Sequence, residues 1–203
     1  MNLIVDAGNT RVKVFMVEED KIIAPEVFAS KDHSQINDFL ASRDFTHCIL
    51  SNVGDHSPSW LKVLSETNGI FIELNANTPV PISSRYKTPE TLGYDRLANV
   101  VASDFLFPGG NILVIDAGTA ITYDLISEGT FMGGAIAPGM QLRFGALDRY
   151  TSRLPRLEYS KEYEIPGKTT RDSILNGVIE GIANEIRGTI NVYKKEYSDL
   201  LTV

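Results

Sequence analysis

The chain carries one pattern of apolar and polar positions twice. Short runs in which apolar residues alternate or follow one another are separated by tight turns, which predicts strands. The first set of predicted strands covers residues 2–6, 11–18 and 21–29. The second set covers residues 112–116, 120–126 and 130–137. This repetition predicts two lobes of related topology, residues 1–107 and residues 112–203.

Helical spacing of apolar residues follows each set of strands. Predicted helices cover 33–42, a segment that starts at Ser57-Pro58, 95–107, 139–148 and 171–197. Further strands are expected at 46–52 and 70–74. Two segments punctuated by Pro, Gly, Ser or Thr, 75–93 and 151–168, are predicted to be irregular. Strands that mix with helices in this way favour an α/β fold.

Charge and composition exclude some classes of protein. The 203 residues have a net charge of −7 and no basic stripe, which argues against nucleic-acid binding. No apolar run approaches the roughly 18 residues of a membrane span, so no membrane interaction is expected. The single cysteine, Cys48, lies in an apolar strand pattern and is predicted to be a buried, inert thiol. His33, His47 and His56 lack the spacing of metal ligands.

An Asp-x-Gly turn stands at the first hairpin of each half. The sequences are "DAGNTRVK" at 6–13 and "DAGTAITYD" at 116–124. One such turn alone is most often an ordinary hairpin turn, whereas two copies in matching places favour a shared function. Glycine lets the backbone approach a ligand closely, and backbone N–H groups in a turn can hold phosphate oxygens. The two carboxylates can hold a cation beside the phosphates, so the pair predicts a nucleotide clamp.

Four further segments carry a resemblance. They are "YKTPETLGYDR" (86–96), "DAGTAIT" (116–122), "GGAIAPG" (133–139) and "TRDSILNG" (170–177). In this order they resemble the signature segments of the type III pantothenate kinase family, in the actin-like ATPase and sugar-kinase superfamily. The resemblance implies two tandem actin-like (ribonuclease H-like) lobes with a cleft between them. Each lobe would contain a mixed sheet that starts with a three-stranded antiparallel meander.

The same resemblance implies an activity. The reaction would be phosphorylation of pantothenate by ATP to 4′-phosphopantothenate, the first step of coenzyme A synthesis. The resemblance also implies Mg²⁺ with ATP, a monovalent cation (K⁺ or NH₄⁺), a homodimer and a cytoplasmic location.

Residue roles follow from the matched motifs by resemblance. Asp95 would be the catalytic base, and Asp116 would bind the monovalent cation. The positions implied to bind pantothenate are Tyr86, Gly93, Tyr94, Asp95, Arg96 and Thr170. The positions implied to bind ATP are Asp6, Ala7, Gly8, Asn9, Thr10, Arg11, Val12, Lys13 and Thr119.

Simpler roles remain open for several of these residues. Asp95 suits a helix terminus on electrostatic grounds, and Arg96 could be a surface arginine. Tyr86 could anchor a loop, and Lys13 could be a solvated lysine on a strand. The segment "GGAIAPG" could be a plain strand-to-helix corner or a helix N-terminus suited to anion binding. Asp124 is interpreted as structural.

Other functional classes also remain open. A non-catalytic nucleotide-binding regulatory or accessory protein of the same fold would be expected to lack the catalytic Asp, and Asp95 is present. Actin-like chaperone and filament ATPases are much longer chains.

The C-terminal sequence carries two further expectations. Family members usually continue past a strand such as "DLLTV" into a "TGG" turn that touches adenosine, while this sequence stops at Val203. Adenine recognition is therefore left open, and Ile182 and Ile186 are candidates for exposure. The glycines of "GVIEG" (177–181) favour close helix packing, within the chain or against a second subunit.

Overall fold

The computed structural model describes residues 1–19, 21–54 and 59–203, which form two compact units. The first unit contains Met1–Val80 and Lys87–Asn99, and the second contains Pro81–Tyr86 and Val100–Val203. The lobe boundaries expected at residues 107 and 112 stay a prediction. His56 and the helix start expected at Ser57-Pro58 lie outside the described residues.

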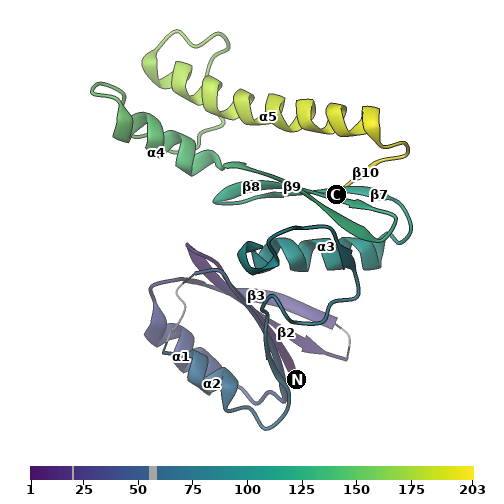
Figure 1. Ribbon diagram of the computed structural model, residues 1–203. Coiled ribbons are helices and arrows are strands. Elements are labelled where there is room, and N and C mark those ends of the chain that lie inside the picture. The colour runs from purple at the N-terminus through teal and green to yellow at the C-terminus, as the bar shows by residue number, and fades with distance from the viewer. Residues whose placement is uncertain (20, 55–58) are drawn as a thin grey trace. The chain divides into compact units, whose positions relative to one another are not determined.

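The first unit contains a five-stranded mixed sheet. Its antiparallel meander consists of β1 (Asn2–Ala7), β2 (Arg11–Glu18) and β3 (Lys21–Ala29). Two strands, β4 (His47–Asn52) and β5 (Phe71–Glu73), extend the sheet in parallel beyond β1, giving the order β3-β2-β1-β4-β5. The helices α1 (His33–Ala41) and α2 (Leu61–Ser65) lie together on one face of this sheet (Figure 1). The predicted meander is therefore confirmed.

Side chains alternate between the two faces of β1 and β2, so core residues and the candidate site residues lie on opposite faces. Leu3, Val5 and Ala7 of β1 are buried and pack in one cluster with residues of both helices. Successive side chains of a strand point to opposite faces, so Asp6 lies on the face away from this cluster. Its cross-strand partner Lys13 lies on the same face.

The second unit repeats this topology. Its meander consists of β7 (Asn111–Ala117), β8 (Ala120–Ser127) and β9 (Thr130–Pro138), and β10 (Leu201–Thr202) pairs in parallel with β7. The short β6 (Ser83–Ser84) adds to β9, so the order is β10-β7-β8-β9-β6. The helices α4 (Met140–Tyr150) and α5 (Thr170–Glu196) lie on one face of the sheet (Figure 1). The expected fold class, two mixed sheets that each begin with a meander, is confirmed.

The segment 75–93 differs from its prediction. The residues expected to be a loop, 75–93, contain β6 and a short 3₁₀ helix, Pro89–Thr91. A two-residue strand is too short to show a period of two, so the sequence pattern could not reveal it. The helix α3 (Tyr94–Leu106) follows, one residue earlier than predicted at its start.

The expectation that Ile182 and Ile186 are exposed is wrong. Ile182 is only 8% exposed, and Ile186 packs against the same buried cluster of the second unit. Their spacing of four places both on the face of α5 that covers the sheet. Buried partners in this cluster include Leu113, Tyr123 and Phe144.

Two neighbouring glycines shape β9 where it crosses β8. Gly133 has a φ of +101°, a conformation that L side chains rarely adopt, and the β8–β9 register shifts beside it. A Cβ on Gly134 would clash with the backbone of Tyr123 and Asp124. These glycines therefore allow a bulge and a close approach of two strands.

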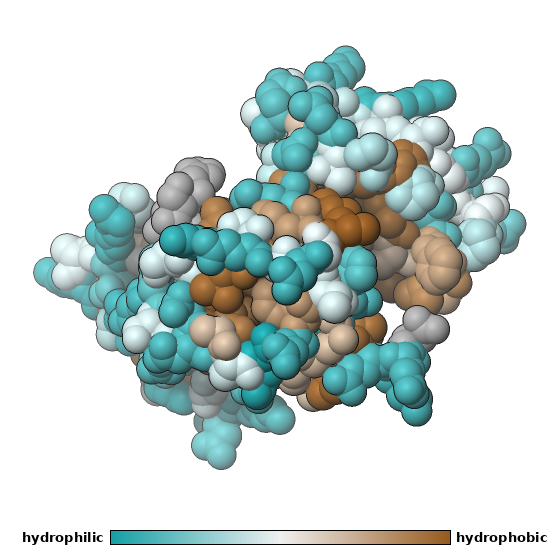
Figure 2. Space-filling view, turned by 90° about the horizontal axis from the view of Figure 1, so that it is seen from below, coloured by the Kyte–Doolittle hydropathy of each residue, from teal (hydrophilic) through white to brown (hydrophobic). Residues whose placement is uncertain are grey.

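Apolar side chains also reach the surface. Figure 2 shows brown patches between teal hydrophilic residues on one face of the molecule. Among the exposed apolar residues, Phe105 is 82% exposed. At Gly177 and Gly181 of α5, no described atom outside the backbone of that helix lies within 4 Å of where a Cβ would stand, so close packing through them within the chain is not observed. No helix of the described residues is long and apolar enough to cross a membrane.

Candidate active site

The first Asp-x-Gly hairpin is a tight turn in the first unit. The Gly8 N–H donates to the Arg11 carbonyl oxygen at 2.9 Å and closes the turn between β1 and β2. At its base, Lys13 Nζ lies 3.5 Å from Asp6 Oδ2, with the two side chains 46% and 35% exposed. Lys13 is therefore an ion-paired residue that solvent still reaches.

Neighbouring segments hold this turn in place and border a cavity of about 260 Å³. Ser30 donates its N–H to the Thr10 carbonyl oxygen and its hydroxyl to the Asn9 carbonyl oxygen. Gly54 packs so closely that a Cβ there would stand 3.0 Å from the Gly8 oxygen. No sequence motif links these surrounding residues to the turn, so they could not be predicted from the sequence. The cavity is lined by Ala7, Gly8, Asn9, Val12, Ser30, Lys31, His33, Asn52, Gly54 and Trp60.

The segment Gly93–Arg96 begins α3 and keeps the Asp95 carboxylate close to the backbone. Asp95 Oδ1 accepts a hydrogen bond from the Arg96 N–H at 2.8 Å, as a first-turn acidic residue can. A Cβ on Gly93 would stand 2.5 Å from the same oxygen, so the carboxylate uses space that only glycine leaves. Arg96 is 4% exposed, and the alternative that it is a surface arginine is wrong.

The second Asp-x-Gly hairpin lies in the second unit and touches the corner that follows β9. The Gly118 N–H donates to the Ala120 carbonyl oxygen at 2.9 Å and closes the turn. The Gly139 N–H donates to the Thr119 carbonyl oxygen at 3.0 Å. This bond occupies one N–H that an anion-binding helix terminus would offer, which favours a structural role for that group. Asp116, at the end of β7, is exposed.

Tyr86 packs against β9 within the second unit. Its ring stacks on Phe131 with centroids 5.7 Å apart and planes 8° from parallel. Tyr86 Cδ2 also lies 3.7 Å from where a Cβ of Gly133 would be. These contacts fit the alternative that Tyr86 anchors its loop. They are also compatible with a further role of Tyr86 in binding.

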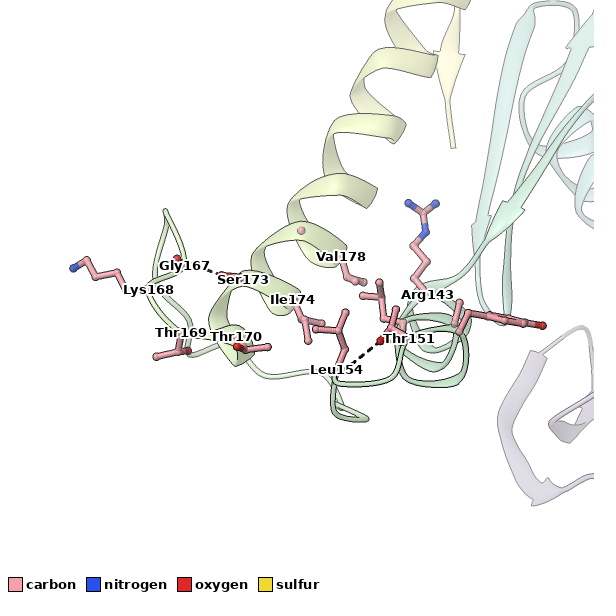
Figure 3. A pocket seen from close by; sticks show the side chains of 14 residues that line it. Arg143, Thr151, Leu154, Gly167, Lys168, Thr169, Thr170, Ser173, Ile174 and Val178 are labelled. Carbon is pink, nitrogen blue, oxygen red and sulfur yellow. Dashed lines mark hydrogen bonds between the residues drawn. The ribbon is translucent and has the colours of Figure 1, made fainter.

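Thr170 is the first residue of α5 and borders a pocket of about 980 Å³ within the second unit. The preceding residue, Thr169, caps the helix by accepting the Asp172 N–H at 3.0 Å. Figure 3 shows Thr169 and Thr170 where α5 begins, with Ile174 and Val178 on the next turns of the helix. The pocket combines hydroxyl groups at a helix N-terminus with an apolar wall from α4 and α5.

A charged cluster that the sequence analysis missed joins α4, α5 and β8. Arg143 Nη2 donates to Glu185 Oε2 at 2.6 Å, and Tyr123 Oη donates to Glu185 Oε1 at 2.9 Å. Burial, together with the hydrogen bond and the charge of Glu185, raises the pKa of Tyr123 to about 12. Burial acts to raise the pKa of Glu185, but the hydrogen bonds from Arg143 and Tyr123 outweigh it and lower that pKa. Since 42 residues separate Arg143 from Glu185, no short motif could have revealed the pair.

The predicted site residues fall into local groups. In the first unit, the hairpin 6–13 and the segment 93–96 each form a local cluster. In the second unit lie the hairpin 116–122, Tyr86 and Thr170. Within the described residues, no group of three or more His, Cys, Asp or Glu side chains is arranged to hold a metal ion.

Comparison with known proteins gives consistent family matches. A sequence model described as "Type III pantothenate kinase" matches residues 2–192. The chain is 41% identical over 204 residues to a type III pantothenate kinase of Phocaeicola vulgatus, covering 99% of this chain and 84% of that protein. It is 36% identical over 206 residues to a type III pantothenate kinase of Christiangramia forsetii, covering 100% and 84%.

Two solved structures are similar in fold. A Baf family protein from Campylobacter jejuni matches with a TM-score of 0.58 and 22% identity, over 99% of this chain and 90% of that one. The Lmo2764 protein of Listeria monocytogenes, a proposed N-acetylmannosamine kinase, matches with a TM-score of 0.56 and 15% identity, over 99% and 82%. At these identities the likeness concerns the fold alone. The matched sequence model and the relatives together show that this chain belongs to the type III pantothenate kinase family.

Proposed function

We propose that the protein transfers the γ-phosphoryl group of ATP to the 4′-hydroxyl of pantothenate, the first step of coenzyme A biosynthesis. Its membership of the family supports ATP and pantothenate as substrates and a divalent metal with the ATP. The arrangement of Gly93, Asp95 and Arg96 at the start of α3 is the observation that supports particular residue roles.

Asp95 is the general base in this proposal. Phosphoryl transfer depends mostly on positioning and charge, and a carboxylate that accepts the proton of the attacking hydroxyl is a recurring part of it. Since Asp95 Oδ1 accepts the Arg96 N–H, we assign the proton-accepting role to Oδ2. The bond to Oδ1 and the tight space at Gly93 support a fixed direction for the carboxylate.

Pantothenate carries a carboxylate, and we propose that Arg96 binds it. A guanidinium can form two parallel hydrogen bonds to a carboxylate, and a largely buried one makes such bonds stronger. We propose that the same substrate contacts Tyr86, Gly93, Tyr94 and Thr170. The hydroxyl groups and apolar wall of the pocket beside Thr170 suit a small molecule with both characters.

ATP phosphates would bind at the two Asp-x-Gly hairpins. We assign phosphate binding to the turn 6–13, with Lys13 as its cation, and to Thr119 of the second turn. Residues of both turns are exposed, among them Asn9, Thr10, Gly118 and Thr119, and phosphate oxygens accept backbone N–H donors in turns readily. Mg²⁺ is usually held by one or two carboxylates together with substrate phosphates. Binding of Mg²⁺ together with ATP therefore does not require a preformed cluster of carboxylates, and the described residues contain none.

The monovalent cation, K⁺ or NH₄⁺, is assigned to Asp116. Such ions take oxygen ligands, and the exposed Asp116 carboxylate stands next to the carbonyl groups of the Gly118–Thr119 turn in sequence. This donor set fits the ion. When bound, the ion would supply positive charge beside the phosphates.

We further propose a homodimer that works in the cytoplasm. Gly181 leaves a part of α5 without close neighbours among the described residues, which supports packing against a second subunit. Cys48 is buried as a free thiol, which fits a reducing compartment.

A coupled assay of ADP release tests the proposed reaction. Purified protein with Mg²⁺, K⁺ and ATP should release ADP much faster when pantothenate is added. Equal rates with and without pantothenate would contradict the substrate assignment and favour a non-catalytic or different role.

A further inference from the structure

We infer that Arg143, Glu185 and Tyr123 are positioning residues that hold the Gly118–Thr119 turn in its working shape. The inference rests on the function proposed above, because that turn is assigned to the phosphates of ATP and to the monovalent cation. None of the three side chains is assigned a contact with either ligand. They act on the site through the backbone of the corner between β9 and α4.

Arg143 holds this corner by two consecutive carbonyl groups. Its side-chain Nε donates to the Pro138 carbonyl oxygen at 2.7 Å. Its main-chain N–H donates to the Gly139 carbonyl oxygen at 3.1 Å, as the first helical bond of α4. A planar guanidinium with several donors suits this fixed geometry better than a lysine ammonium would.

The corner in turn touches the second Asp-x-Gly turn. Pro138 pairs with Ala120 in the β8–β9 ladder, and the Gly139 N–H donates to the Thr119 carbonyl oxygen. A Cβ on Gly139 would clash with the carbonyl oxygens of Gly118 and Thr119. A shift of the corner must therefore move the turn.

Glu185 and Tyr123 fix the direction of the Arg143 side chain. Each carboxylate oxygen of Glu185 accepts one hydrogen bond, from Arg143 on one side and from Tyr123 on the other. Tyr123 lies on β8, three residues after Ala120, so the contacts return to the strand that begins at the turn. Arg143 also borders the pocket beside Thr170, and Figure 3 shows its guanidinium directed away from the labelled residues of the loop.

This closed series of contacts is unusual for a surface ion pair. The Arg143 and Glu185 side chains are only 22% and 32% exposed, and Tyr123 is buried. Hydrogen bonds between partly buried charged groups are short and directional, whereas exposed pairs are easily replaced by water. The cluster can therefore restrict the corner to one position.

Four variants test the inference. Arg143→Ala removes both side-chain bonds, and Arg143→Lys keeps the charge but can satisfy only one partner. Glu185→Ala removes a residue whose side-chain hydrogen bonds go to Arg143 and Tyr123, and Tyr123→Phe keeps the ring in the core. The matched control is Ser127→Ala, which removes a 2.7 Å hydrogen bond to Asn111 at the opposite end of β8.

Hydrogen–deuterium exchange of the peptide that covers residues 116–122 gives a readout independent of activity. We expect Arg143→Ala and Glu185→Ala to speed exchange there by about tenfold, the effect of losing one charge-assisted hydrogen bond. Arg143→Lys and Tyr123→Phe should give intermediate rates. Ser127→Ala should leave this peptide as in the wild type.

Kinetics give the second readout. In Glu185→Ala, the ATP and K⁺ concentrations needed for half-maximal rate should rise by roughly tenfold, while KM for pantothenate changes by less than about threefold. A merely structural role would lower the melting temperature without this selective change.

Two results would overturn the inference. One is unchanged exchange at 116–122 in Arg143→Ala and in Arg143→Lys. The other is an equal increase in the Ser127→Ala control. A wild-type protein that fails to phosphorylate pantothenate would contradict the proposed function instead, and the exchange rates would then decide the inference alone.

Discussion

Gly93 leaves the space that the carboxylate of Asp95 occupies, because a Cβ on residue 93 would stand 2.5 Å from Asp95 Oδ1. The variant Gly93→Ala should therefore push the carboxylate from its position at the start of α3. Misplacing a catalytic group by about 1 Å can cost on the order of 10²-fold in rate, and we expect a fall in kcat of roughly 10- to 100-fold. Steady-state kinetics with pantothenate as the varied substrate would measure it.

The control for this variant is Gly110→Ala, since no described atom lies within 4 Å of a Cβ at Gly110. Its kcat should equal that of the wild type. If Gly93→Ala keeps full kcat as well, the close fit between Gly93 and Asp95 has no catalytic importance.

Lys13 can be tested against another lysine that forms an ion pair. The ion pair between Lys13 and Asp6 is solvent-accessible, and such pairs contribute about 0–1 kcal/mol, so Lys13→Met should change the melting temperature little. If Lys13 contacts phosphate, KM for ATP should rise by about tenfold or more. Lys62→Met is the control, because Lys62 forms an exposed ion pair with Glu66 on α2. Identical kinetics of the two variants would mean that Lys13 is only a solvated lysine.

The proposed cation site predicts a specific ionic requirement. Activity should need K⁺ or NH₄⁺ in addition to Mg²⁺, and Asp116→Asn should raise the K⁺ concentration that gives half-maximal rate. Removing one charged oxygen ligand weakens the hold on a hard cation while leaving the shape of the turn unchanged. Rates measured across a K⁺ titration at constant ionic strength would show this. Full activity in a buffer with Na⁺ as the sole monovalent cation would rule the site out.

Cys48 should be inert in the folded protein, as its apolar surroundings suggest. Burial raises the pKa of the Cys48 thiol to about 12, so at pH 8 only about one molecule in 10⁴ carries the reactive thiolate. Since the folded pKa is raised, this group adds stability below pH 9 and loses that contribution as the pH rises through 12. Labelling with a thiol reagent at pH 8 should be slow in native protein and fast after denaturation. Rapid labelling of native protein would show that β4 opens readily.

Local patterns were enough to predict both meanders. Each strand of the two meanders is six residues or longer, so its period of two is visible, and the tight turns stand between strands in the sequence. The short strand β6 could not be predicted, because two residues carry no period. Its place beside β9 depends on partners nearly 50 residues away.

Predictions about side chains were less complete for a similar reason. The Asp-x-Gly turns are visible as motifs, but the contacts that support them come from distant segments. Ser30 holds the first turn across 21 residues, and Glu185 meets Arg143 across 42 residues. The burial of Ile182 and Ile186 was mispredicted, because an apolar helix face does not reveal from sequence alone what covers it.

The most direct test of the account is the rate at which 4′-phosphopantothenate forms, followed by mass spectrometry in wild-type protein and in Asp95→Asn. Asn keeps the shape of the side chain and can still accept the Arg96 N–H, but it cannot take the proton of the attacking hydroxyl. The account predicts one phosphopantothenate per ADP in the wild type. In Asp95→Asn it predicts a rate lower by on the order of 10²–10⁴, with calorimetric binding of pantothenate largely retained. ADP release without phosphopantothenate, or an Asp95→Asn rate within about threefold of wild type, would contradict it.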